Sequence, residues 1–408
     1  MWKNKNVWIL MLGEGIAGLG MWVGIIGNLE FLQLHVQSDF HKSLILLAGL
    51  FIGVLFGPAA GRTIDRFKKK QVMIYSGILR IFSVICMFLA ISQESVIWMV
   101  GYMLLIGTSG AFYFPALQAA LPMIAKEDEL LSLNGLHMNV GTIARIAGTA
   151  LGGIMLTVFS LYTVYMATFI SYIFIVCCTF ALNIEGGRGA GKLSKEKEDS
   201  KKRGSFKDLW PVVGSVPAVM LGLVLMLVPI SFIGSFNLMV LKISEMQQDP
   251  SIKGWLYTAE GLCFMAGAFL IKKVSKGRST AAFLLATSLL ISLSHLSLVF
   301  AEVKIMSIIS FSMFGLAAGG FFPLIATLFQ KKVPSEYHGR FFSFRNMMDR
   351  VLFQAVLVGT GFFLDTIGFQ YMVILFGSLS LLLSSWMLIR NKKGPVYHES
   401  RNAAEIKR

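Results

Sequence analysis

Residues 43–92 of the chain read SLILLAGLFIGVLFGPAAGRTIDRFKKKQVMIYSGILRIFSVICMFLAIS. Two apolar runs, 43–60 and 71–92, flank a short segment that carries five basic residues and one acidic residue. A run of about 20 apolar residues is long enough for an α-helix to cross a bilayer. This stretch therefore predicts two membrane-spanning helices joined by a short, basic loop.

The same alternation extends in both directions along the 408-residue chain. The chain is 55% hydrophobic and 14% charged, whereas soluble domains average about 25% charged residues. Pro217 and Pro229 predict a kink in the long seventh apolar run. We expect an all-α membrane protein with twelve transmembrane helices, at residues 7–29, 43–60, 71–92, 97–121, 137–159, 162–183, 211–240, 254–271, 279–300, 304–329, 341–364 and 368–389.

Lysine and arginine residues predict the orientation. Of the 37, 30 lie on the side of the N-terminus, four lie in the opposite loops and three lie within apolar runs. Because cytosolic loops carry the excess of basic residues, we expect a multi-pass protein of the plasma membrane with both termini in the cytosol. The net charge of +15 then follows from topology, and nucleic acid is not an expected partner.

A polar, charge-rich segment divides the apolar runs six and six. It predicts a flexible cytosolic linker at residues 184–210, between six-helix bundles at residues 1–183 and 211–408. The halves also resemble each other, since Gly107 and Phe114-Pro115 recur 208 residues later as Gly315 and Phe322-Pro323. Six helices return the chain to its starting side, so the halves are expected to be parallel pseudo-repeats.

Small residues mark three helices for close packing. Gly13, Gly20 and Gly27 recur every seven residues in the first span, and Gly57 and Gly61 lie four apart at the end of the second. In the fifth span, a third small surface is formed by Gly148, Gly152 and Gly153. Such spacing lets helix backbones approach each other in a membrane. Static packing and sliding between helices are both compatible with it.

Two of these segments carry a family resemblance. The run Gly61-Arg62-Thr63-Ile64-Asp65-Arg66-Phe67-Lys68-Lys69-Lys70 resembles the G-x-x-x-D-R-x-G-R-K loop of the major facilitator superfamily, with Lys68 in place of a glycine. The run from Ala144 to Gly153 resembles the G-x-x-x-G-P-x-x-G-G motif of its antiporters, with Thr149 in place of the proline. Phe114-Pro115-Ala116 and the run from Gly339 to Ser343 are similar to the macrolide-efflux and siderophore-export branch of drug:proton antiporters.

The resemblance implies a role for Gly61, Asp65 and Arg66 as a gating loop. Asp65 would lie near the positive N-terminal end of the eleventh helix and stabilise the outward-facing state. The alternative is that the basic residues from Arg62 to Lys70 serve as a positive-inside anchor. The resemblance of Gly148 and its neighbours to the antiporter motif favours export.

Ionisable residues within the apolar runs are the best candidates for function, because a charge at mid-membrane costs several kcal/mol unless it meets water or a partner. By resemblance, the first, fifth, eighth and eleventh helices line the transport cavity. Glu14 and Glu260 are therefore expected to carry protons or to bind a cationic substrate group, and Arg145 and Arg350 are further candidates for coupling or substrate binding. The alternative is an ion pair with Arg145 or Arg350.

Other charged residues receive more modest interpretations. Asp349 is a further candidate for coupling, and local pairing is its alternative. By analogy with the family, Arg80 is expected to be a structural anchor on a peripheral helix. Glu30 and Asp39 fall near the membrane surfaces and are expected to be solvated.

The resulting function is secondary transport, with proton-coupled efflux of amphipathic small molecules, and so multidrug resistance, as the first hypothesis. A facilitator that flips or imports a lipid-like or nutrient substrate is the alternative. The chain is not expected to be an enzyme, because it has no P-loop and its GxSG match at Gly107 is a short motif among 40 glycines. No metal or cofactor is expected, and the partners are the substrate and membrane lipid, with the protein working as a monomer.

The orientation predicts the accessibility of the linker to thiol reagents. In a Ser194→Cys variant, a membrane-permeant maleimide should label the new thiol in intact cells, and an impermeant maleimide should label it only after the cells are lysed. Labelling of intact cells by the impermeant reagent would place the linker outside and contradict the charge-based topology.

Overall fold

The computed structural model describes residues 4–124, 129–183, 214, 216–274, 279–334 and 337–392. The predicted linker at 184–210 lies outside these residues. Two compact units are formed, the first from residues 1–198 and 248–258 and the second from residues 199–247 and 259–408. The sequence-based boundary differs from this division at residues 248–258, which pack with the first unit.

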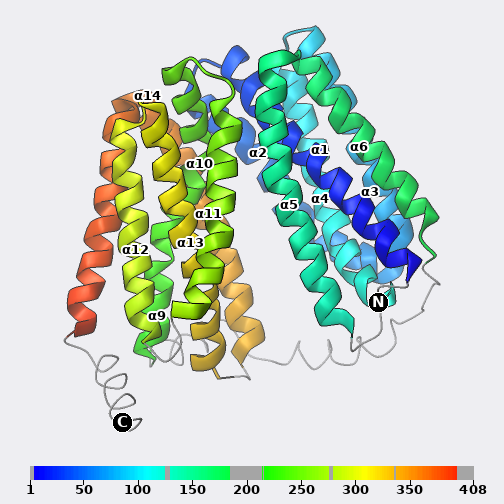
Figure 1. Ribbon diagram of the computed structural model, residues 1–408. Coiled ribbons are helices and arrows are strands. Elements are labelled where there is room, and N and C mark those ends of the chain that lie inside the picture. Colours follow the sequence, from blue (N-terminus) through cyan, green and yellow to red (C-terminus); the bar gives the residue numbers. More distant parts are fainter. Residues whose placement is uncertain are drawn as a thin grey trace. The chain divides into compact units, whose positions relative to one another are not determined.

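Six long helices make up most of the first unit (Figure 1). Side-chain oxygens cap the starts of three helices, with Asn4, Ser38 and Ser160 accepting from backbone N–H groups two or three residues later. α1 packs against α5 and α6, α4 packs against α2 and α3, and α3 also packs against α6. The helices are α1 (Lys5–His35), α2 (Asp39–Arg66), α3 (Lys69–Ser92), α4 (Val96–Ile124), α5 (Leu130–Val158) and α6 (Leu161–Ala181).

The second unit is helical in the same way, and in it α12 and α10 both pack against α14 while α12 also packs against α13. The seventh span is interrupted at Met226, three residues before Pro229, in the region where the sequence predicts a kink. Pro217 begins a helix instead of bending one. The elements are α9 (Pro217–Leu225), α10 (Leu227–Gln247), α11 (Ile252–Val274), α12 (Thr280–Ser297), the 3-10 turn η3 (Leu298–Phe300), α13 (Lys304–Lys332) and α14 (His338–Lys392). The residues of α11 up to 258 belong to the first unit.

The described residues contain 11 helical segments that are long and apolar enough to cross a membrane. The last of them covers 47 residues, Phe344–Arg390, which at 1.5 Å per residue would extend about 70 Å, far beyond one bilayer. Gly368 breaks this segment with φ of 81°, a conformation that favours glycine. Two crossings therefore share α14, and the prediction of a twelve-helix, all-α membrane fold is confirmed.

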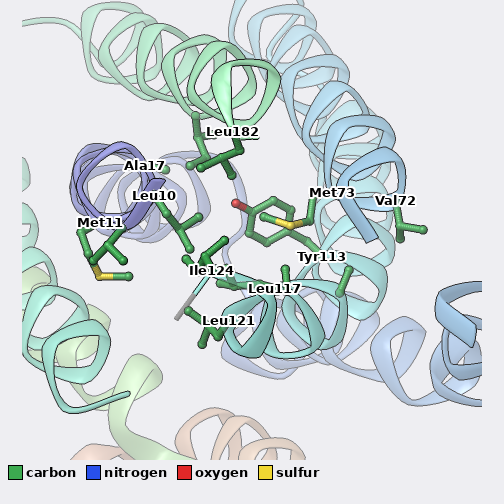
Figure 2. Packing of buried hydrophobic residues seen from close by; sticks show 14 of the residues in the cluster. Leu10, Met11, Ala17, Val72, Met73, Tyr113, Leu117, Leu121, Ile124 and Leu182 are labelled. Carbon is green, nitrogen blue, oxygen red and sulfur yellow. The ribbon is translucent and has the colours of Figure 1, made fainter. Parts of the chain in front are cut away.

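All six helices contribute to one buried cluster in the first unit, at the end that holds the start of α1. Figure 2 shows Leu10 of α1, Met73 of α3, Leu117 of α4 and Leu182 after α6 converging on the ring of Tyr113. The tyrosine hydroxyl points toward α1 (Figure 2). The cluster thus fixes the position of one polar group, the hydroxyl of Tyr113, among apolar side chains.

The periodic glycines of α1 face α6. A Cβ atom on Gly20 would overlap the hydroxyl of Ser171 and lie 3.4 Å from Cα of Thr168, while one on Gly27 would lie 3.1 Å from the ring of Tyr165. On the other side of α1, a Cβ atom on Gly148 of α5 would lie 2.8 Å from the backbone oxygen of Leu19. Side chains at these positions would push the helices apart, so glycine sets the distances between α1, α5 and α6.

The repeat-related glycines Gly107 and Gly315 occupy equivalent helix crossings in the two units. A Cβ atom on Gly107 of α4 would overlap the backbone oxygen of Gly49 on α2, and one on Gly315 of α13 would overlap the backbone oxygen of Glu260 on α11. The internal similarity seen in the sequence therefore corresponds to the same kind of backbone contact in each unit.

The expected close approach at Gly57 and Gly61 is not formed in this structure. No described atom lies within 4 Å of a Cβ atom on either residue. Gly61 also belongs to a helix, because α2 continues to Arg66. The small-residue spacing was correctly recognised, but spacing alone does not supply a neighbouring helix.

The α1–α6 crossing predicts a strong effect of a single methyl group. Gly20→Ala should destabilise the purified protein by about 1–3 kcal/mol, the usual cost of overpacking, and lower its melting temperature in detergent. Gly101→Ala is the matched control, since Gly101 of α4 has open space around it and alanine is the better helix former. Ser171→Gly should restore part of the stability lost in Gly20→Ala; an unchanged melting temperature in Gly20→Ala would contradict the close packing.

Candidate functional site

Glu14 lies inside the first unit, on α1, with its side chain 13% exposed. The hydroxyl of Tyr113 on α4 donates to Oε1 of Glu14 over 2.6 Å. Nε2 of His137 on α5 lies 3.9 Å from Oε2, the other carboxylate oxygen. Three helices thus bring a carboxylate, a phenol and an imidazole together, and neither of these two neighbours of the carboxylate carries a permanent charge.

Arg80 of α3 adds a permanent positive charge to this cluster. Its guanidinium carbon lies 4.5 Å from the ring centroid of Tyr113 and 5.3 Å from that of Tyr172 on α6. The residue is 5% exposed. The structural anchor expected at Arg80 stays a prediction, but its charge lies within the bundle beside the phenol that binds Glu14, a neighbour that the sequence did not indicate.

The alternative interpretation of Glu14, an ion pair with Arg145 or Arg350, is not supported by the described contacts. The guanidinium of Arg145 lies 6.0 Å from the ring centroid of Trp22. Arg350 is exposed on α14. Glu14 instead has Tyr113 and His137 as its neighbours.

The second unit contains the other two predicted carboxylates. Glu260 of α11 is 6% exposed, and its backbone oxygen contacts Gly315. Asp349 of α14 pairs with Arg345 one turn earlier over 3.5 Å, and its Oδ1 is buried without a described hydrogen-bond partner. The local pairing considered for Asp349 is thus present in the structure.

The motif from Gly61 to Lys70, which contains the predicted gating residues, divides between the end of α2 and the start of α3. Gly61, Asp65 and Arg66 belong to the last turns of α2, and the side chain of Asp65 lies outside the described residues. Nζ of Lys70 donates to the backbone oxygens of Phe180 and Leu182 at the end of α6, over 2.8 and 2.7 Å. A lysine in this position satisfies carbonyl groups that lack partners in the helix, so Lys70 is more than a topological anchor.

The first unit also contains a buried ion pair that sequence reasoning missed. The side chain of Lys253 is 0% exposed, and its Nζ lies 2.7 Å from Oε2 of Glu30, whose side chain is 13% exposed. Nearby in the sequence, Asp39 and Lys42 form a second buried pair over 2.7 Å. The expectation that Glu30 and Asp39 are solvated is wrong. The partner of Glu30 comes from a distant segment, which a span boundary does not reveal, whereas the partner of Asp39 is the nearby Lys42.

Tyr113 and His137 are the other groups that sequence reasoning did not connect with Glu14. Tyr113 was visible as the one hydroxyl-bearing residue in the aromatic run Phe112-Tyr113-Phe114. A buried tyrosine hydroxyl usually has a hydrogen-bond partner, which is the signal that could have linked it to a buried carboxylate. No comparable signal joined His137 to α1.

Comparison with known proteins supports a transport function. The profile of the Major Facilitator Superfamily matches residues 10–352 and 230–407. The chain is 24% identical over 404 residues to the uncharacterized MFS-type transporter YfiS of Bacillus subtilis, which covers 96% of this chain and 94% of that protein. It is 26% identical to macrolide efflux protein A of Streptococcus pyogenes over 39% of this chain and 40% of that protein. It is 25% identical to the lysophospholipid transporter LplT of Citrobacter koseri over 37% of each chain.

Solved structures show the same fold. The nucleoside transporter NupG superposes with a TM-score of 0.71 over 94% of this chain and 98% of its own, at 12% identity. At this level of identity the likeness concerns the fold alone. These relatives are membrane transporters and not enzymes, in agreement with the sequence-based expectation.

The buried ion pair predicts a stability test. Lys253→Met should destabilise the protein by about 3–5 kcal/mol, because Glu30 is left as a buried charge without its cation. The double variant Lys253→Met with Glu30→Gln should recover much of this loss, measured as melting temperature in detergent. Lys242→Met is the control, since the Lys242–Glu245 pair is partly exposed and should change stability by less than about 1 kcal/mol. Equal changes in melting temperature from the two lysine substitutions would show that burial of the pair does not affect stability.

Proposed function

Since the chain belongs to the Major Facilitator Superfamily of membrane transporters, we propose that it exports amphipathic small molecules in exchange for protons by alternating access. In this proposal the protein works as a monomer in the plasma membrane with both termini in the cytosol. The basic residues concentrated on the side of the N-terminus support this orientation. The partial similarity to macrolide efflux protein A supports the direction of transport and the amphipathic character of the substrate.

The environment of Glu14 is the observation that carries the coupling proposal. A carboxylate that is locked into a buried ion pair, as Glu30 is with Lys253, resists protonation because that would leave the cation unpaired. Glu14 instead receives its short hydrogen bond from the neutral phenol of Tyr113. A hydroxyl group both donates and accepts, so the phenol can bond to Glu14 in either protonation state.

A proton cycle follows from this pairing. In the ionised state, Oε1 of Glu14 accepts the hydrogen bond of Tyr113. When Glu14 takes up a proton, its own O–H group can donate while the phenol oxygen accepts, so the pair stays hydrogen-bonded. His137 is a second polar group beside the carboxylate, with its Nε2 3.9 Å from Oε2. The carboxyl group of Glu14 therefore keeps its hydrogen bond to Tyr113 whether it holds the proton or releases it.

Flipping or import of a lipid-like or nutrient substrate is the second candidate function. It is favoured by the similarity of part of the chain to the lysophospholipid transporter LplT. The fold accommodates either activity, since function depends on the groups of the site and not on the fold. An efflux assay with a panel of drugs, run beside an uptake assay with a lysophospholipid, separates the two candidates.

The coupling proposal predicts different effects on gradient-driven and passive transport. In cells that lack their own pumps, Glu14→Gln should reduce gradient-driven efflux at least about tenfold, while passive exchange of substrate across vesicles should be kept. Glu260→Gln is measured in the same two assays, alone and combined with Glu14→Gln. Glu302→Gln is the control, because Glu302 is an exposed carboxylate whose contact with Gln370 lies outside the cluster.

Each result assigns a role. Loss of both activities in Glu14→Gln would mean that the carboxylate binds a cationic substrate or holds the fold. If the two single variants and the double variant all keep full gradient-driven efflux, neither carboxylate couples transport to protons. Asp349 would then be tested next.

A further inference from the structure

Arg80 is a buried cation whose charge the transport proposal has not used. It is 5% exposed, and its Nε atom has no hydrogen-bond partner among the described residues. Arginine stays protonated in proteins. A permanent charge in an apolar bundle is costly unless something compensates it, so its surroundings are informative.

Aromatic rings surround the guanidinium group. Its carbon lies 4.5 Å from the ring centroid of Tyr113, 5.3 Å from that of Tyr172 and 5.7 Å from that of Phe114. A cation over an aromatic face is attracted by the negative potential of the ring. The nearest of these rings is the one whose hydroxyl donates to Glu14.

Tyr113 therefore has a cation on its face and a carboxylate on its hydroxyl. The ring is 1% exposed and is packed in the buried cluster of the first unit (Figure 2), so it has little freedom to leave either neighbour. A positive charge over a phenol ring draws electron density from the oxygen and makes the O–H group a stronger donor. The same charge favours a nearby carboxylate in its ionised form.

We propose that Arg80 is a positioning residue for Glu14, acting through Tyr113 to favour release of the proton from the Glu14 carboxyl group. This inference rests on the proposed role of Glu14 in coupling and adds the residue that sets when the proton leaves. Arg80 touches neither substrate nor proton. It holds the phenol in place and supplies a fixed charge.

The sign of the effect follows from the charges around Glu14. The helices packed against α1 contribute Tyr113 from α4, His137 from α5 and, through the phenol, Arg80 from α3, while α6 contributes the neutral Tyr172 beside Arg80. Of these groups, Arg80 is the one with a permanent charge. Replacing it by a neutral residue should therefore leave Glu14 protonated up to a higher pH.

The test measures protonation of Glu14 directly. Dicyclohexylcarbodiimide adds to protonated carboxyl groups in apolar surroundings, so labelling of the Glu14 peptide is followed by mass spectrometry over a range of pH on the purified full-length protein. In Arg80→Gln the midpoint of labelling should move up by about one pH unit, a tenfold change in proton affinity. Glu14→Gln is the blank. Arg390→Gln is the matched control, because Arg390 also lies over an aromatic ring, that of Trp386, at 5.5 Å.

A conservative variant keeps the test decisive if Arg80→Gln does not fold. Arg80→Lys keeps the charge but loses the planar group, and should move the midpoint by less than half as much. In a Tyr113→Phe background, Arg80→Lys should have no further effect, because the link to Glu14 is already broken. A midpoint unchanged in both Arg80 variants, or an equal shift from Arg80→Lys with and without the Tyr113 hydroxyl, would overturn the proposal.

Two further measurements distinguish the role of Arg80 from the proposed coupling role of Glu14. The series is repeated in a His137→Gln background, so that the midpoint is also measured without the imidazole beside Glu14. Labelling needs neither a gradient nor a substrate. A shifted midpoint with an unshifted pH profile of efflux would therefore support the role of Arg80 and contradict coupling through Glu14, whereas an unshifted midpoint would overturn the role of Arg80 alone.

Discussion

Close approach of helix backbones is the constraint on which this structure depends. Lipid is as apolar as leucine, so the hydrophobic effect does not drive helices in a membrane to associate. Their association depends on van der Waals contact and interhelical hydrogen bonds instead. Gly20 on α1 and Gly148 on α5 allow those contacts in the first unit, and Gly107 and Gly315 do so at equivalent crossings of the two units. Once the backbones are this close, the polar side chains between them have few positions available.

Charged groups inside the first unit are compensated in two different ways. Glu30 and Lys253 form a direct ion pair, which stabilises both charges together and penalises the loss of either. Glu14 and Arg80 are instead joined through one phenol ring, with a hydrogen bond at one end and an aromatic face at the other. The direct pair is suited to holding structure, whereas the indirect pair leaves the carboxylate able to exchange its proton.

The same fold is found in proteins whose names refer to nucleosides and peptides, at 12–13% identity. What distinguishes this chain must therefore lie in individual side chains and not in the helix arrangement. Four helices each contribute one residue to the cluster: Glu14 from α1, Tyr113 from α4, His137 from α5 and Arg80 from α3. Because these helices are fixed by backbone contacts, the four side chains form a defined cluster without any residue of a loop.

The amino-acid sequence by itself determined the helices, because a span of about 20 apolar residues in a bilayer has no alternative to satisfying its own backbone groups. It also indicated the repeat and identified Glu14 as a buried ionisable residue, since both are properties of local composition and spacing. It could not place Arg80 beside Tyr113, or Lys253 against Glu30, although the residues themselves were visible. Those contacts join residues 33 and 223 positions apart in the sequence. Pairing over such a separation depends on which helices cross and on how each is rotated about its axis, and only the tertiary structure decided both.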